Sequence, residues 1–317
     1  MAELSQDFWE GRSVVVTGGA GFLGRAVVRD LQALNADVRV VRSADHDLRD
    51  PHAARAAVDG AQAVIHLAAE VGGIGFNRAN PAPLVYDNLM MTANVFEACR
   101  DAAVDKLVAA CTVCAYPKFV DAPFREDDLW NGYPEESNAP YGLAKKMMLV
   151  LSDAYRRQYG FDSCAPIVAN LYGPNDNFDL ESSHVIAAMI RKFVEAIDRG
   201  DDSVMLWGTG RPSREFLYVD DAARGLLLAG ERLDVSDPVN LGVGRETRIG
   251  ELAELIHRLT GFEGTIRWDT SRPDGQPKRY LDVSRARELM GFEAQVALED
   301  GLQRTIASFR EQTARVE

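Results

Sequence analysis

The stretch that decides the fold is Val14-Val15-Val16-Thr17-Gly18-Gly19-Ala20-Gly21-Phe22-Leu23-Gly24, an apolar run that ends in a glycine-rich turn. Its glycines fit both the GxGxxG and the TGxxGxxG spacing. Glycine lets the backbone turn sharply and approach a pyrophosphate, which then binds the free N–H groups of the next helix. A strand before the turn and a helix after it distinguish such a site from a glycine-rich turn without a ligand. We therefore predict a dinucleotide-binding turn here.

Apolar β-branched runs alternate with helical patterns through the first half of the chain. This alternation indicates βαβ units, and strands that are apolar throughout indicate a sheet covered by helices on both faces. We predict an α/β fold with a doubly wound parallel sheet of the Rossmann type. The predicted strands are Ser13–Thr17, Asp37–Val41, Ala63–Leu67, Lys106–Cys111 and Ser163–Ala169, with helices beginning near Gly24, Pro51, Leu84 and Tyr141.

The pattern changes at a loop rich in Pro, Asn and Asp (Gly173–Ser183). A helix at Val185–Ile197 and a short strand at Val204–Trp207 are predicted after it, and Asp220–Arg232 is predicted to return as a helix to the sheet. We expect two interleaved domains that share a cleft. Residues 8–172 and 214–243 form the predicted Rossmann domain, and residues 173–213 and 244–317 form a smaller C-terminal substrate domain.

The amino-acid composition limits the classes of function that the protein can have. Of 317 residues, 46% are hydrophobic and 26% charged, which is ordinary for a globular chain. The net charge, 35 basic minus 48 acidic residues or −13, argues against nucleic acid or a membrane surface as a partner but not against a small phosphorylated ligand. No apolar run reaches the length of a membrane span, and the acidic N-terminus lacks the features of a signal peptide. Four cysteines are too few for a disulfide scaffold, so we expect a cytoplasmic protein.

The end of the second predicted strand bears on the choice of dinucleotide. An acidic residue at this position bonds the ribose 2′-OH of NAD, but this chain has Arg42. An arginine can accommodate a 2′-phosphate, which favours NADP(H) over NAD(H). The alternative is that Arg42 is a solvated charge at the strand end, since Asp45 and Asp47 follow closely.

Tyr141 and Lys145 lie four residues apart, on one face of a predicted helix. A nearby ammonium is expected to lower the pKa of the phenol, so that the tyrosine exchanges a proton with a substrate oxygen. Together with the glycine turn, this pair resembles the extended short-chain dehydrogenase/reductases. The resemblance implies that Thr112, at a strand end, hydrogen-bonds the reacting carbonyl oxygen; the alternative is a plain strand-end threonine.

Cys111 and Cys114 form a CxxC pattern. A second CxxC or CxxH is missing, and the pair ends a strand, so we predict neither a redox pair nor a metal site. We expect Cys111 to pack in the core and Cys114 to lie where the sheet edge opens onto the cleft.

A narrower resemblance rests on short motifs from the glycine turn to about Asp282. They resemble the GDP-L-fucose synthase family, the GDP-4-keto-6-deoxy-mannose 3,5-epimerase-4-reductases. The motifs are Val71-Gly72-Gly73-Ile74, Cys114-Ala115-Tyr116-Pro117-Lys118, Asn170-Leu171-Tyr172-Gly173-Pro174, Asp176-Asn177-Phe178, Ser183-His184-Val185-Ile186, Trp207-Gly208-Thr209-Gly210, Arg214-Glu215-Phe216 and Arg272-Pro273-Asp274-Gly275.

The resemblance implies roles for further residues. Cys114 and His184 would exchange protons at C3 and C5 of a 4-keto sugar; the alternative for His184 is a neighbour of a helix cap. Arg214, Arg191 and Lys192 would bind the diphosphate, because guanidinium groups suit phosphate oxygens. Further predicted substrate contacts are Asn170, Val185, Trp207 and Lys278. The predicted cofactor contacts are Gly18, Gly21, Phe22, Leu23, Gly24, Arg42, Asp47, Leu48, Leu67, Ala68, Ala69, Tyr141 and Lys145.

Two other functions stay open. A redox-neutral nucleotide-sugar epimerase could use the same residues and return the hydride to a tightly held NAD(P), whereas a non-catalytic sensor would have no need of them. By analogy with the superfamily we also expect a homodimer through the helices near Leu84 and Tyr141. Its face could include Ala93, Phe96, Met147, Leu149 and Val150, which could equally be core residues.

Overall fold

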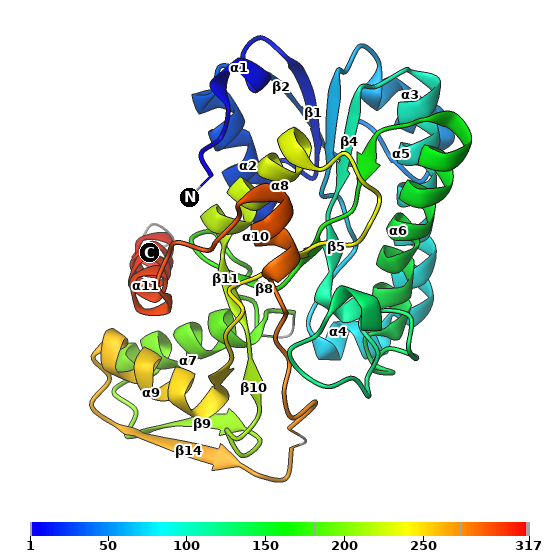
Figure 1. The fold of residues 1–317 in the computed structure, drawn as a ribbon. Helices are drawn as coiled ribbons and strands as arrows, with labels where there is room; N and C mark the ends of the chain where they lie inside the picture. The colour runs from blue at the N-terminus through cyan, green and yellow to red at the C-terminus, as the bar shows by residue number, and fades with distance from the viewer. Residues whose placement is uncertain (1, 181, 273, 315–317) are drawn as a thin grey trace.

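The computed structural model describes residues 2–180, 182–272 and 274–314. Pro273 of the last quoted motif and the predicted domain end at 315–317 lie outside the described residues. The described residues form an upper part built on a parallel sheet and a lower part built mainly of helices (Figure 1).

The upper part contains a five-stranded parallel sheet in the order β2-β1-β3-β4-β6. Helices α2 and α8 pack together on one face of it, and α3, α5 and α6 pack on the other (Figure 1). This confirms the predicted doubly wound α/β fold. The strands are β1 (Ser13–Thr17), β2 (Asp37–Val41), β3 (Ala63–His66), β4 (Lys106–Ala109) and β6 (Ser163–Cys164), and the helices are α2 (Phe22–Ala33), α3 (Pro51–Val58), α5 (Pro81–Asp101), α6 (Ala139–Tyr159) and α8 (Val219–Arg232).

Two predicted strands are each broken in two. Lys106–Cys111 divides into β4 and β5 (Cys111–Thr112), and Ser163–Ala169 divides into β6 and β7 (Ile167–Val168). Pro166 lies at the second break, where it has no N–H to continue the ladder, and its carbonyl accepts from the Cys111 N–H at 2.9 Å. Strand β7 then pairs on both sides, with β5 and with β12 (Asn240–Leu241). The chain therefore turns into a second small sheet whose end carries Thr112.

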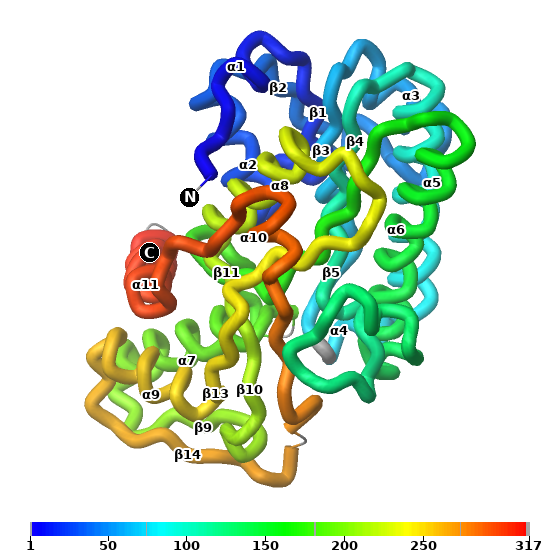
Figure 2. Tube along the Cα trace, viewed as in Figure 1, coloured from blue at the N-terminus to red at the C-terminus, as the bar shows by residue number. Residues whose placement is uncertain are grey.

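The lower part has its own hydrophobic cluster, which includes Ile190, Phe193, Leu252 and Ile256. It is built from α7 (Val185–Arg199), β9 (Ser203–Trp207), α9 (Ile249–Thr260), β14 (Thr265–Asp269) and α11 (Leu298–Ala314), with β9 and β14 paired in parallel. The chain crosses between the two parts several times (Figure 2).

Helix α10 (Ser284–Met290) packs on α8 and adds Ala286 and Met290 to the core of the upper part, although it lies within the predicted substrate domain. The other domain boundaries stay a prediction. The remaining elements are α1 (Gln6–Trp9), α4 (Ile74–Ala79), two 3-10 turns at Val113–Ala115 and Glu126–Asp128, β8 (Asn170–Tyr172), β10 (Ser213–Arg214), β11 (Phe216–Tyr218) and β13 (Thr247–Arg248). Within the described ranges, no helix is long and apolar enough to cross a membrane.

Candidate active site

The glycine turn forms a close cradle between β1 and α2. Gly18 has a positive φ of 70°, and a Cβ there would lie 2.8 Å from the amide nitrogen of Ala68. A Cβ on Gly24 would collide with the carbonyl oxygen of Gly18. Phe22 and Leu23 form the first turn of α2, behind the N-cap Gly21. The turn therefore has the close packing and the free helix N-terminus that fit a dinucleotide pyrophosphate.

A buried network that sequence reasoning missed fixes the neighbouring loop. The Thr17 hydroxyl oxygen accepts from the N–H groups of Leu67 and Ala68 at 3.2 and 3.3 Å and lies 2.8 Å from Nδ1 of His66. Burial lowers the pKa of His66 to about 3, so the imidazole is neutral and its Nδ1 can accept from the hydroxyl. Thr17 thus ties the predicted cofactor loop, Leu67–Ala69, to the glycine turn.

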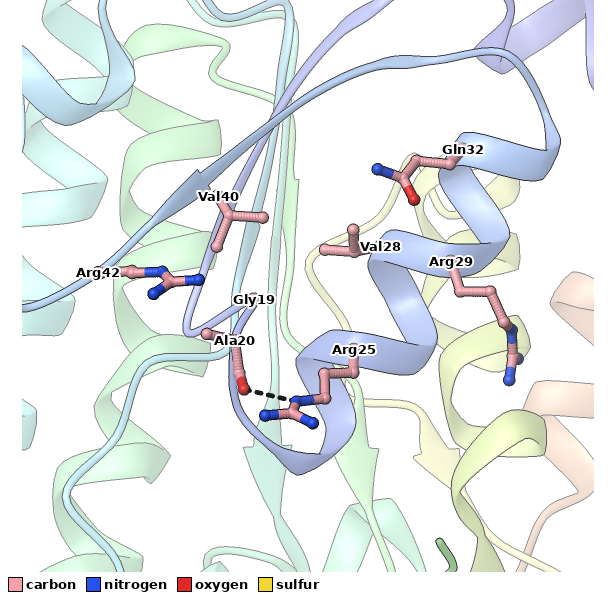
Figure 3. Close-up of a pocket in the computed structure, with 8 residues that line it drawn as sticks. All are labelled: Gly19, Ala20, Arg25, Val28, Arg29, Gln32, Val40 and Arg42. Atoms are coloured by element: carbon pink, nitrogen blue, oxygen red, sulfur yellow. Dashed lines mark hydrogen bonds between the residues drawn. The ribbon is translucent and has the colours of Figure 1, made fainter. Parts of the chain in front are cut away.

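The other predicted cofactor residues differ in their surroundings. Arg42 follows β2 and lines a pocket beside the turn (Figure 3). Asp47 is bonded to Arg49, whose guanidinium lowers the pKa of Asp47 to about 2. Leu48 is buried, and its carbonyl accepts from the side-chain amide of Asn94.

Four of the five predicted catalytic residues lie together where β5 meets α6. The Thr112 hydroxyl accepts from the N–H of Cys114 at 3.2 Å, and it is close enough to the Tyr141 phenol to affect its pKa. Cys114 is partly accessible, whereas Cys111 is buried, as predicted. Gly142 lets the helix reach this turn, because a Cβ there would collide with the carbonyl oxygen of Cys114.

Burial governs the ionisation of the Tyr141–Lys145 pair. It raises the pKa of Tyr141, with Cys114 and Cys111 adding to the rise and the Thr112 hydroxyl opposing it. The expectation of a lowered phenol pKa is therefore wrong in this structure. Lys145 is only 2% exposed, and desolvation lowers its pKa to about 8. Tyr141 is thus a protonated phenol at neutral pH and can act as a proton donor.

His184 comes from the lower part of the molecule, at the N-cap of α7. The N–H of Gly73 donates to the carbonyl of Ser182 at 2.8 Å, which ties this segment to the upper part. The His184 side chain is exposed to solvent, and desolvation by the protein atoms around the imidazole, together with the positive charge of Arg279, lowers its pKa. His184 is therefore a neutral base at neutral pH.

Among the described residues, neither Arg214 nor Arg279 has a carboxylate within ion-pair distance, although the more distant Asp274 raises the pKa of Arg214 somewhat. Arg214 donates to the carbonyls of Ser213 and Gln276 at 2.7 and 2.6 Å, and burial together with Arg279 lowers its pKa to about 10. Sequence reasoning missed Arg279 and chose its neighbour Lys278, which is 64% exposed and reaches Glu246 at 3.4 Å. The positive charge of Arg279 lowers the pKa of both His184 and Arg214, and we call these three residues the electrostatic cluster. Its two guanidinium groups suit a diphosphate.

The remaining predicted substrate residues have defined partners. Arg191 is paired with Glu195 at 2.6 Å, so an anion would have to compete with that carboxylate. The Lys192 ammonium lies 5.5 Å from the ring of Trp207, and Arg272 lies 4.9 Å from it. The Asn170 amide donates to the carbonyl of Glu215, and Val185 packs on the lower core.

The fold and the site together define a nicotinamide-dependent enzyme of the extended short-chain dehydrogenase/reductase class. The defining features are a Rossmann-type sheet, a glycine turn, and a Tyr-Lys pair beside a strand-end threonine. The model of the NAD dependent epimerase/dehydratase family matches residues 14–242, and the chain belongs to this family.

Individual relatives specify this similarity further, and they confirm the resemblance of the sequence motifs to the GDP-L-fucose synthase family. The chain is 40% identical, over 93% of its length and 91% of the relative's, to the probable GDP-L-fucose synthase 1 of Oryza sativa subsp. japonica. A GDP-L-fucose synthetase from Naegleria fowleri bound to NADP superposes with a TM-score of 0.87 at 30% identity, covering 96% of both chains. A GDP-6-OMe-4-keto-L-xylo-heptose reductase from C. jejuni gives a TM-score of 0.89 at 26% identity, covering 96% of this chain and 99% of the other.

Proposed function

We propose that the protein epimerises a GDP-4-keto-6-deoxy-hexose at C3 and C5 and then reduces it at C4 with NADPH, giving GDP-L-fucose or a close analogue. One observation carries the proposal. Thr112, Cys114, Tyr141 and Lys145 meet at one strand end, and the segment that carries His184 is hydrogen-bonded to the upper part through the N–H of Gly73 and the carbonyl of Ser182.

The nucleotide half of the substrate has a matching surface. Arg214 and Arg279 supply positive charge that no described carboxylate neutralises within ion-pair distance, as a diphosphate requires. The indole of Trp207 is 64% exposed and offers an aromatic ring for stacking, although a base stacked on it would have to share the ring with Arg272 and Lys192. The choice of guanine rests on the names of the relatives.

The sugar ketone makes its neighbouring C–H groups acidic, because a carbanion at C3 or C5 delocalises into the carbonyl as an enolate. We assign to Thr112 the hydrogen bond to the carbonyl oxygen where this charge develops. Inversion then needs a proton removed from one face and another returned to the opposite face. Cys114 and the neutral imidazole of His184 are the two groups that we assign to this exchange.

Reduction follows in the same cleft. The nicotinamide, when bound, supplies a hydride to C4. Tyr141 is protonated and donates its phenolic proton to the oxygen, which becomes a hydroxyl. Lys145, a buried residue one turn further along the same helix, supports the charge that then develops on the phenol.

We assign NADP(H) as the cofactor. The assignment is supported by Arg42 at the end of β2, where an acidic residue would favour NAD. The similarity to an NADP-bound structure points the same way.

The alternative, a redox-neutral epimerase, would use the same Tyr141 and Lys145. Incubation with GDP-4-keto-6-deoxymannose, following the absorbance of NADPH, separates the two. The proposal requires one NADPH oxidised for each sugar consumed, whereas the alternative predicts sugar turnover without net oxidation.

We also propose a cytoplasmic homodimer. Its interface would use the outer face of α5 and α6, where Tyr86, Leu89 and Val150 are exposed apolar residues. Phe96 and Leu149, expected as candidates for this face, are instead buried in the upper core. The four cysteines are unpaired thiols, three of them buried, which suits a reducing compartment. Sedimentation of the protein across a range of concentrations tests the dimer.

A further inference from the structure

A pocket of about 290 Å³ lies between the glycine turn, helix α2 and the end of β2 (Figure 3). Its lining is rich in positive charge and contains no carboxylate. The lining residues are Gly19, Ala20, Arg25, Val28, Arg29, Gln32, Val40 and Arg42.

The three arginines of this pocket differ in their partners. Arg29 is neutralised, because it reaches Asp30 at 2.7 Å and Asp220 at 3.0 Å. Arg25 and Arg42 have no carboxylate within ion-pair distance among the described residues, in a chain whose net charge is −13. Two unneutralised guanidinium groups facing one pocket are suited to an anion.

Arg25 is also oriented toward the pocket. Its Nε donates to the carbonyl of Ala20 at 3.0 Å, which holds the guanidinium over the glycine turn. Its two terminal nitrogens have no protein acceptor among the described residues. Figure 3 shows Arg25 and Arg42 on opposite sides of Ala20, one from α2 and one after β2.

We propose that Arg25 and Arg42 together bind the 2′-phosphate of NADP(H), and that Arg25 is a residue that determines cofactor specificity. The inference rests on the proposed use of a nicotinamide dinucleotide. The ribose that carries the phosphate lies at the end of the second strand in this fold, which is where the pocket opens. A phosphate dianion would accept from both guanidinium groups, whereas the 2′-OH of NAD(H) would find no carboxylate acceptor in the pocket.

Equilibrium binding without any sugar tests the proposal. NADPH and NADH are titrated into the purified protein, with quenching of tryptophan fluorescence as the signal, for the wild type and for Arg25→Gln, Arg42→Gln and the control Arg29→Gln. We expect Arg25→Gln to weaken NADPH binding about 10- to 100-fold, the range for losing a hydrogen bond between charged groups. NADH binding should change less than about twofold, which also shows that the turn has kept its fold.

Adenosine 2′,5′-bisphosphate and 5′-AMP, titrated as competitors, isolate the phosphate itself. Arg25→Gln should lower the affinity for the bisphosphate and leave that for 5′-AMP unchanged. Equal affinities of Arg25→Gln and Arg29→Gln for NADPH would overturn the assignment of Arg25. Because no sugar is present, failure of the proposed sugar chemistry would leave this result standing, and the reverse also holds.

Discussion

Gly142, in the first turns of helix α6, lies directly against the backbone of Cys114. A Cβ added to Gly142 would lie 2.9 Å from the carbonyl carbon of Cys114 and closer still to its oxygen. The helix that carries Tyr141 and Lys145 therefore approaches the cysteine turn as closely as backbones allow. This contact sets the distance between the residues assigned to proton exchange and those assigned to reduction.

Gly142→Ala should consequently lower activity while leaving the protein folded. The helix or the cysteine turn must shift to admit the methyl group, and a shift near 1 Å at a reacting centre can cost about 100-fold in rate. Steady-state turnover and the thermal unfolding midpoint are the measurements. Gly132→Ala is the control, since its nearest neighbour would be a Pro117 side-chain atom at 3.3 Å. Equal activity of the two variants would contradict the role given to this contact.

Tyr141→Phe should separate the two halves of the reaction. Without the phenolic proton, C4 reduction should slow by about 10²- to 10⁴-fold, the usual contribution of a general acid. Exchange at C3 and C5 should continue, because it uses Cys114 and His184. NADPH oxidation and solvent-deuterium exchange, measured on the same sample, give both rates. Loss of exchange together with reduction would show that Tyr141 also serves the epimerisation.

Arg279→Gln should raise the pKa of His184. The positive charge of Arg279 disfavours protonation of the imidazole, so its removal makes the cation easier to form. An NMR titration of the His184 ring protons measures the change directly. Lys278→Gln is the matched control, because Lys278 points to Glu246 instead. A pKa of His184 that is the same in both variants would refute the electrostatic cluster.

Much of this architecture is readable from sequence, because it depends on local rules. Strands β1 and β2 have their predicted bounds. For β1 the reason is local, since an apolar run followed by the glycine turn at Gly18 admits few other conformations. The breaks in β4 and β6 were not predictable from apolar periodicity, because they depend on which strand lies opposite Pro166. The directions of individual side chains also could not be predicted from the sequence. Lys278 and Arg279 are adjacent cations, and only the fold decides that the charge of Arg279 acts on His184 while Lys278 reaches Glu246.

Glu215 makes stability depend on pH. Burial raises its pKa from 4.5 to about 7, against the pull of the N–H groups of Leu281, Val243 and Gly244. The folded state therefore keeps the proton after the unfolded state has lost it, and the free energy of unfolding falls as pH rises through this interval.

Glu215→Gln should remove this part of the pH dependence. It should also lower the free energy of unfolding at neutral pH by about 1–3 kcal/mol, because the amide NH₂ must face a buried N–H donor. Urea unfolding at pH values on both sides of the interval measures both effects. Glu254→Gln, on the exposed surface of α9, should keep the wild-type slope. An unchanged slope in Glu215→Gln would mean that other groups titrate.

The most direct test of the central claim is a single incubation of the wild-type protein with GDP-4-keto-6-deoxymannose and NADPH in deuterated water. NMR reports deuterium at each carbon of the product, and absorbance reports NADPH. We predict stoichiometric loss of NADPH with deuterium at both C3 and C5. Loss of NADPH without deuterium would make the protein a simple C4 reductase and would contradict the assignment of Cys114 and His184.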